Sequence, residues 1–317
     1  MRLADRNGPS CRGRGGCRGL TIALGLGAGA LALLAASPAG AYCRTSTCAA
    51  GVAGELCTPA DPADCGKPLY WAQPCFGFSV QQNASQQVPF DTADATAKLA
   101  FLAWLTADCG AGAHPTMKVA DFGAIECAAR EYNQNGGNAN IIVFRDDAWP
   151  YAGQWNTLAL TTVTYSLDTG EIYDADMEIN SSDVVLTTSD TNVQFDLQSI
   201  MTHEAGHMLG LAHSKVPDST MGRQYLAGDT SLRTLATDDV TAICAVYPPN
   251  PAVDLNSCDP TPRHGFQSTC GPMPQEDSGC TLGPPSPHRG LPSALLAALG
   301  TGAMLTRRRR RRVGSGS

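Results

Sequence analysis

Positive charge is scarce in the body of this chain. Between residues 42 and 279 the sequence carries ten lysines and arginines against 28 aspartates and glutamates, a formal net charge near −18. A nucleic-acid partner requires a basic surface, so this balance excludes nucleic acid as a partner of the body. The same balance is typical of a soluble extracellular protein.

Long apolar runs are absent from the body and occur only near the two ends, at residues 20–36 and 291–306. The first run follows five arginines and precedes a small-x-small sequence at residues 39–41. This order predicts that residues 1–41 are an export signal that is removed. The alternative is a helix that anchors the chain in a membrane, for which the run is short.

Cysteine usage agrees with export. Eleven of the 13 cysteines follow the signal, and an odd number in an exported protein leaves one thiol to explain. The other ten could form five disulfides in an oxidising compartment, with a connectivity that the sequence leaves open. Four of them lie in residues 42–68, which we expect to be a disulfide-tied N-terminal extension with little regular structure.

Histidine is also scarce, yet three of the six histidines lie in residues 203–213. His203 and His207 are four residues apart, which places them one turn apart on the same face of a helix. Gly210 can adopt the positive φ that ends a helix, so that His213 can return as a third ligand. Three protein ligands leave an open position for water, as in a catalytic zinc site.

Glu204 lies beside the predicted metal without being a ligand. A carboxylate in this position can take a proton from a zinc-activated water and give one to the leaving amine, as general base and then general acid. The alternative is a buried helix with chance histidines. The short pattern HExxH occurs by chance in unrelated proteins, whereas HExxHxxGxxH fixes five positions and favours a metal site.

On these residues the chain resembles the metzincin metalloproteases. That family has a methionine turn beneath the metal, and Met221, which follows His213 at a short distance, is the candidate for it. The alternative for Met221 is ordinary core packing. The resemblance implies an α+β fold, with a mixed twisted sheet, a zinc helix and a C-terminal helix. It also implies a zinc endopeptidase whose ligands are His203, His207 and His213, with Glu204 as the catalytic residue.

The order of predicted elements resembles the matrixin branch of the metzincins over residues 69–250. Period-two and helical patterns predict these elements: strands at 75–81, 117–122 and 141–144, a helix at 92–108, a hairpin from 158–167 to 171–180, the zinc helix at 197–209 and a last helix from 237. The helix at 92–108 should have Ala95, Leu99, Leu102 and Ala103 on its apolar face, with Asp91 or Thr92 as its cap. The resemblance implies that extended substrate adds to the edge strand near residues 157–160.

Two further metal sites, a structural zinc site and a calcium site, differ in how well the sequence fits them. Vertebrate-type matrixins have a second, structural zinc with three more histidines, and this sequence lacks enough histidines for one. Asp174, Asp176 and Glu178 alternate along one strand face and could hold calcium, with Asn180 next on the same face. The alternative is an ordinary solvated face.

Tyr225 follows Met221 at a longer distance than the tyrosine that contacts zinc in some metzincins. We therefore interpret it as a pocket wall or as packing. The loop at residues 215–228 is expected to line the pocket for the residue after the cleaved bond.

The C-terminal part has a different composition. Residues 251–286 are rich in Pro, Ser, Gly and Cys and predict an exposed tether, in which Cys258 and Cys270 could pair. Residues 287–317 combine the second apolar run with six arginines, which fits a transmembrane segment with a cytoplasmic stop. Together with Cys280 they resemble the C-terminal sorting signals of myxobacterial surface proteins.

In that class a sorting peptidase cuts at the cysteine, which becomes the point of lipid attachment. The alternative is a plain membrane helix. Membrane contact is therefore expected only through the C-terminal segment or a lipid.

The sequence as a whole predicts an exported zinc endopeptidase, either extracellular or attached to the cell surface or outer membrane, with protein or peptide substrates. The alternative is a cell-surface adhesion or binding protein that carries a non-proteolytic zinc domain. The intact Glu204 argues against that alternative, because a binding protein needs no general base.

Overall fold

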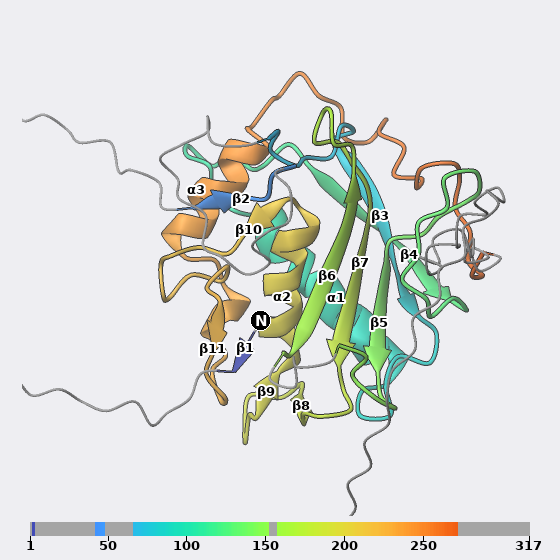
Figure 1. Ribbon diagram of the computed structural model, residues 1–317. Helices are drawn as coiled ribbons and strands as arrows, with labels where there is room; N and C mark the ends of the chain where they lie inside the picture. The colour runs from blue at the N-terminus through green and yellow to red at the C-terminus, as the bar shows by residue number, and fades with distance from the viewer. Residues whose placement is uncertain (1, 4–41, 48–65, 152–156, 272–317) are drawn as a thin grey trace, which may run out of the picture. The chain divides into compact units, whose positions relative to one another are not determined.

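The computed structural model describes residues 2–3, 42–47, 66–151 and 157–271 (Figure 1). Nearly all of the predicted export signal lies outside the described residues, as do Cys280 and the predicted transmembrane segment at 287–317. The second compact unit, residues 274–317, lies wholly outside them as well. Within the part of the chain that is described, no helix has both the length and the apolar character needed to cross a membrane.

The described elements follow one another along the chain. They are β1 (Arg2–Leu3), β2 (Cys43–Arg44), β3 (Cys75–Gln81), α1 (Phe90–Leu105), β4 (Lys118–Ile125), β5 (Ile141–Arg145), β6 (Ala159–Tyr165), β7 (Ile172–Asn180), β8 (Leu186–Thr187), β9 (Phe195–Asp196), α2 (Leu197–Met208), β10 (Leu211–Ala212), β11 (Gln224–Tyr225), the 3-10 helix η1 (Ser231–Arg233) and α3 (Thr237–Val246).

A five-stranded mixed sheet organises the domain, with the strand order β4-β3-β5-β7-β6. Four strands run parallel, and β6 pairs antiparallel with β7 through the predicted hairpin. β6 therefore lies at one edge of the sheet, as predicted, and only one of its sides is paired with a strand of this sheet. Helix α2, the predicted zinc helix, contacts this antiparallel edge strand β6.

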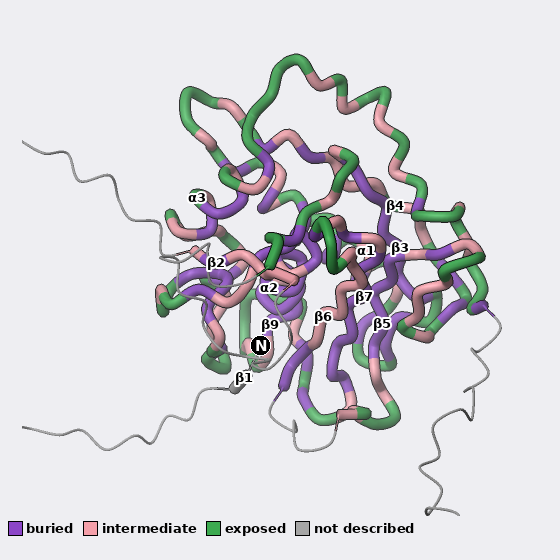
Figure 2. Tube along the Cα trace, turned by 45° about the horizontal axis from the view of Figure 1, so that its top comes forward, coloured by how far each residue is buried: buried purple, intermediate pink, exposed green. Residues whose placement is uncertain are grey.

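Helices α1 and α2 pack against each other and against one face of the sheet (Figure 1). The main core fills the space between these layers and includes Phe78, Trp104, Met177, Ile200 and Met201. Buried positions are concentrated in α2 and the central strands, whereas the loops at the top of the view are largely exposed (Figure 2). The zinc helix is thus a central element of the core and is held from several sides.

The orientation of α1 differs from the prediction. Leu99 and Leu102 are 48% and 50% exposed, while Ala97, Phe101 and Trp104 are buried. The predicted face was wrong because two leucines on the solvent side outweighed the small residues on the core side. The predicted caps were also wrong, since the helix begins at Phe90 with Pro89 as its N-cap and has no side-chain cap.

Residues 251–271, predicted to be part of an exposed tether, are mostly exposed but are tied to the domain by disulfides. Disulfides join Cys75 to Cys258 and Cys127 to Cys270. The predicted pairing of Cys258 with Cys270 is therefore wrong. A third disulfide joins Cys109 to Cys244 at the other end of the domain.

This C-terminal segment, residues 251–271, lies along strand β4 and the loop after it. Asn138 pairs with Phe266 in a short parallel bridge, and the backbone N–H groups of Glu126 and Cys127 donate to the carbonyl of Ser268. In Figure 1 the segment passes over the top of the sheet and descends beside β4. It covers a second, smaller apolar cluster around Ile125 and Ile141, on the sheet face opposite the helices.

Candidate metal centre

Helix α2 is fixed at its N-terminus by a buried charge. Asp196 is the N-cap residue, and its carboxylate accepts a hydrogen bond from the Ser199 N–H at 2.8 Å. Arg233 holds the same carboxylate through two of its nitrogens, at 2.8 Å and 2.5 Å. Tyr225 accepts the Asp196 N–H at 2.8 Å and is fully buried, which confirms its interpretation as packing.

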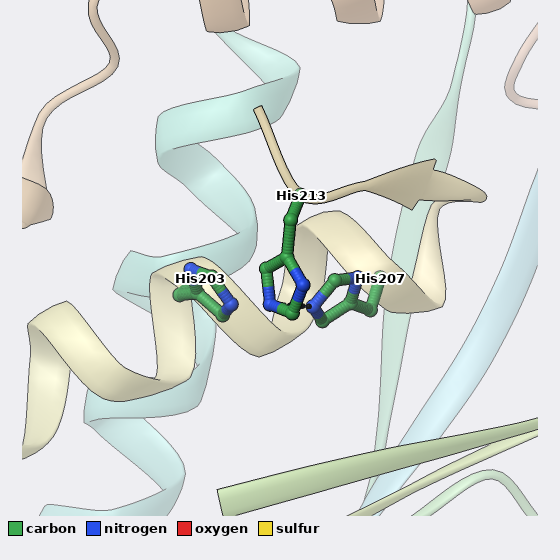
Figure 3. A group of neighbouring side chains, drawn as sticks. All are labelled: His203, His207 and His213. Carbon is green, nitrogen blue, oxygen red and sulfur yellow. Dashed lines mark hydrogen bonds between the residues drawn. The ribbon is translucent and has the colours of Figure 1, made fainter. Parts of the chain in front are cut away.

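The structure brings His203, His207 and His213 together (Figure 3). The first two project from successive turns of α2, and His213 comes from the loop after β10. One ring nitrogen from each lies within 4.8 Å of the others. The three imidazoles therefore face a common point from two different elements.

Backbone carbonyls fix the tautomers of the two helical histidines. His203 Nδ1 lies 2.6 Å from the carbonyl oxygen of Thr220, and His207 Nδ1 lies 2.8 Å from that of Leu211. A carbonyl accepts hydrogen bonds, so each Nδ1 carries the proton and each Nε2 presents a lone pair. His203 Nε2 is buried and has no hydrogen-bond partner among the described residues.

Burial also keeps the imidazoles neutral. Removal from water disfavours the charged form and lowers the pKa of His203, His207 and His213 below the ordinary value for histidine. Zinc binds neutral imidazole, so no proton has to be displaced at neutral pH. Three convergent neutral nitrogens, one of them buried without a partner, fit a zinc ion with an open fourth position.

Glu204 is adjacent to this cluster and is almost fully buried. Its Oε2 accepts a hydrogen bond of 2.7 Å from the hydroxyl of Thr161 on the edge strand β6. The carboxylate is thus next to the histidines of α2 and bonded to the edge strand β6. Nothing in the sequence pattern had singled out Thr161, because a threonine in a strand is ordinary.

Met221, the predicted methionine of the turn, packs against helix α2 at Gly206. A Cβ added to Gly206, between the two helical histidines, would lie 2.3 Å from the Met221 sulfur and 2.7 Å from Trp104. The helix therefore needs glycine at this position to let the methionine turn approach. The turn is held by Asp239, whose carboxylate accepts the backbone N–H groups of Thr220 and Met221 at 2.7 and 3.0 Å.

Asp239 also lies in the first turn of the last helix, α3, which begins at Thr237 as predicted. Its carboxylate accepts the N–H of the N-cap residue Ala236 at 2.9 Å. The first turn of α3 therefore caps its own helix and supports the methionine turn with one carboxylate.

Gly210 ends the zinc helix with a φ of +90°, as predicted. An added Cβ there would lie 2.7 Å from the carbonyl oxygen of Leu69, so glycine is required for the backbone to pass. Strand β10, which follows Gly210 directly, pairs with the N-terminal strand β2. The Thr45 N–H donates to the Gly210 carbonyl at 3.0 Å. This contact of the N-terminal extension with the metal loop was not predicted.

The predicted calcium residues lie on the sheet face opposite the helices. The solvated-face interpretation is wrong, because all of these side chains are buried: Asp174, Asp176, Glu178 and Asn180. Asp174 Oδ1 has no hydrogen-bond partner among the described residues. The calcium site itself stays a prediction.

Most of the carboxylate oxygens on this face already have donors. Asp176 accepts the backbone N–H groups of Ile141 and Glu131 at 2.9 and 3.1 Å. Glu178 forms an ion pair of 2.5 Å with Arg145. These contacts stabilise the packing of the loop after β4 against the sheet.

Comparison with known proteins agrees with this geometry. Residues 131–248 match the family model for matrixin. Metalloendoproteinase 5-MMP of Arabidopsis thaliana is 34% identical over 128 residues, which cover 39% of this chain and 34% of that protein. Matrilysin of Rattus norvegicus is 30% identical over 116 residues, which cover 35% of this chain and 41% of that protein.

These matches are local, since the chain spans less than half the length of either relative. Within the matched region the α+β fold is that of a metzincin-like catalytic domain, as the sequence predicted. The similarity supports a zinc metalloendopeptidase. The whole C-terminal segment, residues 251–271, and all of β2 lie outside the matched residues.

Proposed function

We propose that this chain is an exported zinc-dependent endopeptidase that hydrolyses peptide bonds within proteins or peptides. The observation that carries the proposal is the convergence of three neutral histidine nitrogens within 4.8 Å, next to the buried carboxylate of Glu204. The matrixin match and the metalloendoproteinases among the relatives support this reaction class.

The proposed roles of the metal, the three histidines and Glu204 follow from their positions. When bound, zinc would supply a Lewis acid that polarises the scissile carbonyl and lowers the pKa of a water molecule. His203, His207 and His213 would hold it, with two of the three imidazoles oriented by backbone carbonyls. Glu204 accepts the proton of the attacking water and then returns a proton to the amine that leaves.

Substrate binding is proposed to use the outer edge of β6, on the side away from β7. An extended peptide placed beside this strand would add to the sheet through main-chain hydrogen bonds. Such bonds do not depend on the side chains of the substrate, so affinity would come from the backbone and selectivity from neighbouring pockets. The loop at residues 215–228 is the proposed wall of the pocket after the cleaved bond.

The test is direct. The purified protein is incubated with casein and with a peptide library, with and without a zinc chelator. Cleavage within peptides that disappears with the chelator and returns with added zinc supports the proposal. Failure of the zinc-loaded, folded protein to cleave any member of the library would contradict it and favour a binding protein.

Export and surface attachment are part of the proposal. Three disulfides between distant cysteines support an oxidising compartment, because such bonds are rare in the cytosol. We further propose that a sorting peptidase cleaves at Cys280 and that the cysteine then carries a lipid. Intact mass spectrometry of surface-located protein tests this, since mature protein that retains the six terminal arginines would rule sorting out.

A further inference from the structure

The edge strand and the catalytic carboxylate are joined by one side chain. Thr161 lies in the middle of β6, opposite Met177 of β7 in the sheet register. Its hydroxyl lies 2.7 Å from Glu204 Oε2 and 3.3 Å from the Glu204 carbonyl oxygen. A hydroxyl has a single proton to donate, so Thr161 donates it in the shorter contact, to the carboxylate oxygen.

We propose that Thr161 is a positioning residue that orients the Glu204 carboxylate for proton transfer. The terminal torsion χ3 of a glutamate side chain has a broad range of angles, so a hydrogen-bond donor is needed to fix the plane of the carboxylate. The hydrogen bond from Thr161 fixes one oxygen and hence the plane of the group. This inference rests on the proposed function and assigns a role that the resemblance did not supply.

The location of Thr161 connects two parts of the proposed reaction. β6 is the strand to which an extended substrate would add, and α2 carries the base and two of the proposed ligands. A side chain of β6 that bonds to the base sets its distance from the strand along which the scissile bond would lie. Small misplacements of reacting groups are costly, since proton transfer requires hydrogen-bond distance.

Three variants separate positioning from structure. Thr161→Val keeps the shape and the strand preference but removes the donor, whereas Thr161→Ser keeps the donor. Thr187→Val is the matched control, because Thr187 is a strand threonine of β8, outside the proposed substrate-binding strand. Its hydroxyl accepts the Gln194 N–H at 3.0 Å and makes no hydrogen bond to Glu204.

The measurements use the full zinc-loaded chain and a fluorogenic peptide chosen for cleavage by the wild type. We expect kcat of Thr161→Val to fall about 10- to 100-fold, the range for loss of a hydrogen bond to a charged group. KM and zinc content should change less than about twofold. Thr161→Ser should recover most of kcat, and Thr187→Val should match the wild type.

A readout independent of activity comes from crystal structures of the variants. The Glu204 side chain should leave its wild-type rotamer in Thr161→Val and keep it in Thr161→Ser. Thr161→Ala removes the donor without adding bulk and serves as the second variant if Thr161→Val fails to fold. The same loss of kcat is expected.

Several outcomes overturn the inference. An unchanged kcat in Thr161→Val, or a loss confined to KM, would show that the hydroxyl does not position the base. Loss of zinc would show a structural role instead. A wild-type protein that fails to cleave, or a Glu204→Ala variant that cleaves, would refute the proposed function itself and is therefore distinct from failure of the Thr161 assignment.

Discussion

The hydroxyl of Thr45 donates a hydrogen bond of 3.0 Å to the carbonyl oxygen of Leu211. The same carbonyl lies 2.8 Å from His207 Nδ1, so one oxygen serves both the N-terminal strand and a metal-facing histidine. Because β2 also pairs antiparallel with β10, the N-terminal extension supports the loop that carries His213. A segment outside the matrixin match therefore contributes to the order of the metal centre.

A first prediction follows for Thr45→Val. The loss of this hydrogen bond should reduce stability by about 0.5–1.5 kcal/mol and accelerate zinc release, because the metal loop loses a support. Zinc release into a chromophoric chelator measures the rate. Thr47→Val is the matched control, since the Thr47 hydroxyl bonds to the Lys67 N–H and not to the metal loop. Equal release rates in the two variants would contradict the assigned support.

The second prediction concerns the base. Glu204→Ala should keep its zinc, because the ligands remain, and should lose cleavage by at least about 10²–10⁴-fold. Metal analysis and a peptide assay on the same preparation measure both. Substantial turnover in the zinc-loaded variant would remove Glu204 from the mechanism and favour the binding-protein alternative.

The third prediction concerns the third histidine. His213→Ala should bind zinc far more weakly than the wild type, since two imidazoles make a poor site. Equilibrium dialysis against zinc measures the affinity. The matched control is His114→Ala, whose ring bonds to the Ala107 carbonyl at 3.0 Å, outside the proposed ligand set. A tightly held zinc in His213→Ala would show that the loop histidine is not a ligand.

The fourth prediction tests the C-terminal segment. A chain that ends at residue 250 loses the partners of Cys75 and Cys127 and should be less stable than a chain that ends at residue 272. Loss of a native disulfide typically costs about 2–5 kcal/mol. Urea unfolding of the two chains measures the difference, and equal midpoints would favour the interpretation of residues 251–271 as a tether.

The fifth prediction concerns pH. Burial raises the pKa of Asp176 to about 8, and burial together with the neighbouring Asp176 raises the pKa of Asp174. In the unfolded chain these carboxyls titrate near ~3.9, so between about pH 4 and pH 8 the folded state binds more protons. Stability should therefore fall as pH rises through this window.

Thermal midpoints measured from about pH 5 to about pH 8 test this slope. Asp174→Asn should flatten it, whereas Asp168→Asn, at an exposed turn, should leave it unchanged. A midpoint that rises with pH would contradict the prediction. Added calcium at high pH tests the calcium site as well, since an ion held by these carboxylates should raise the midpoint.

Much of the fold could be predicted because its signals are local. Strand β3 has the predicted bounds, β5 differs only by including Arg145, and the hairpin of β6 and β7 follows from its turn. The convergence of the three histidines could also be predicted, because it follows from their spacing along the sequence and from the turn at Gly210. Such features depend on residues close together in the sequence.

The remaining features depend on distant partners. Thr161 acquires its role only because α2 brings Glu204 against β6. The buried face of α1 is set by Trp104, whose indole N–H bonds to the Thr202 carbonyl at 2.8 Å, and not by the outward leucines. Disulfide pairing likewise depends on which loops meet in space, and spacing alone does not give it.

The disulfides Cys75–Cys258, Cys109–Cys244 and Cys127–Cys270 constrain when the chain can mature during synthesis. Their cysteines are 183, 135 and 143 residues apart, and the partner that emerges last is Cys258, Cys244 or Cys270. The zinc helix leaves the ribosome or translocation channel before any of these bonds can close. Chains arrested before residue 244 would therefore carry a complete metal signature on a domain that lacks these three bonds. Oxidation of the cysteines after the chain is released is then the step that distinguishes the mature protein from incomplete chains.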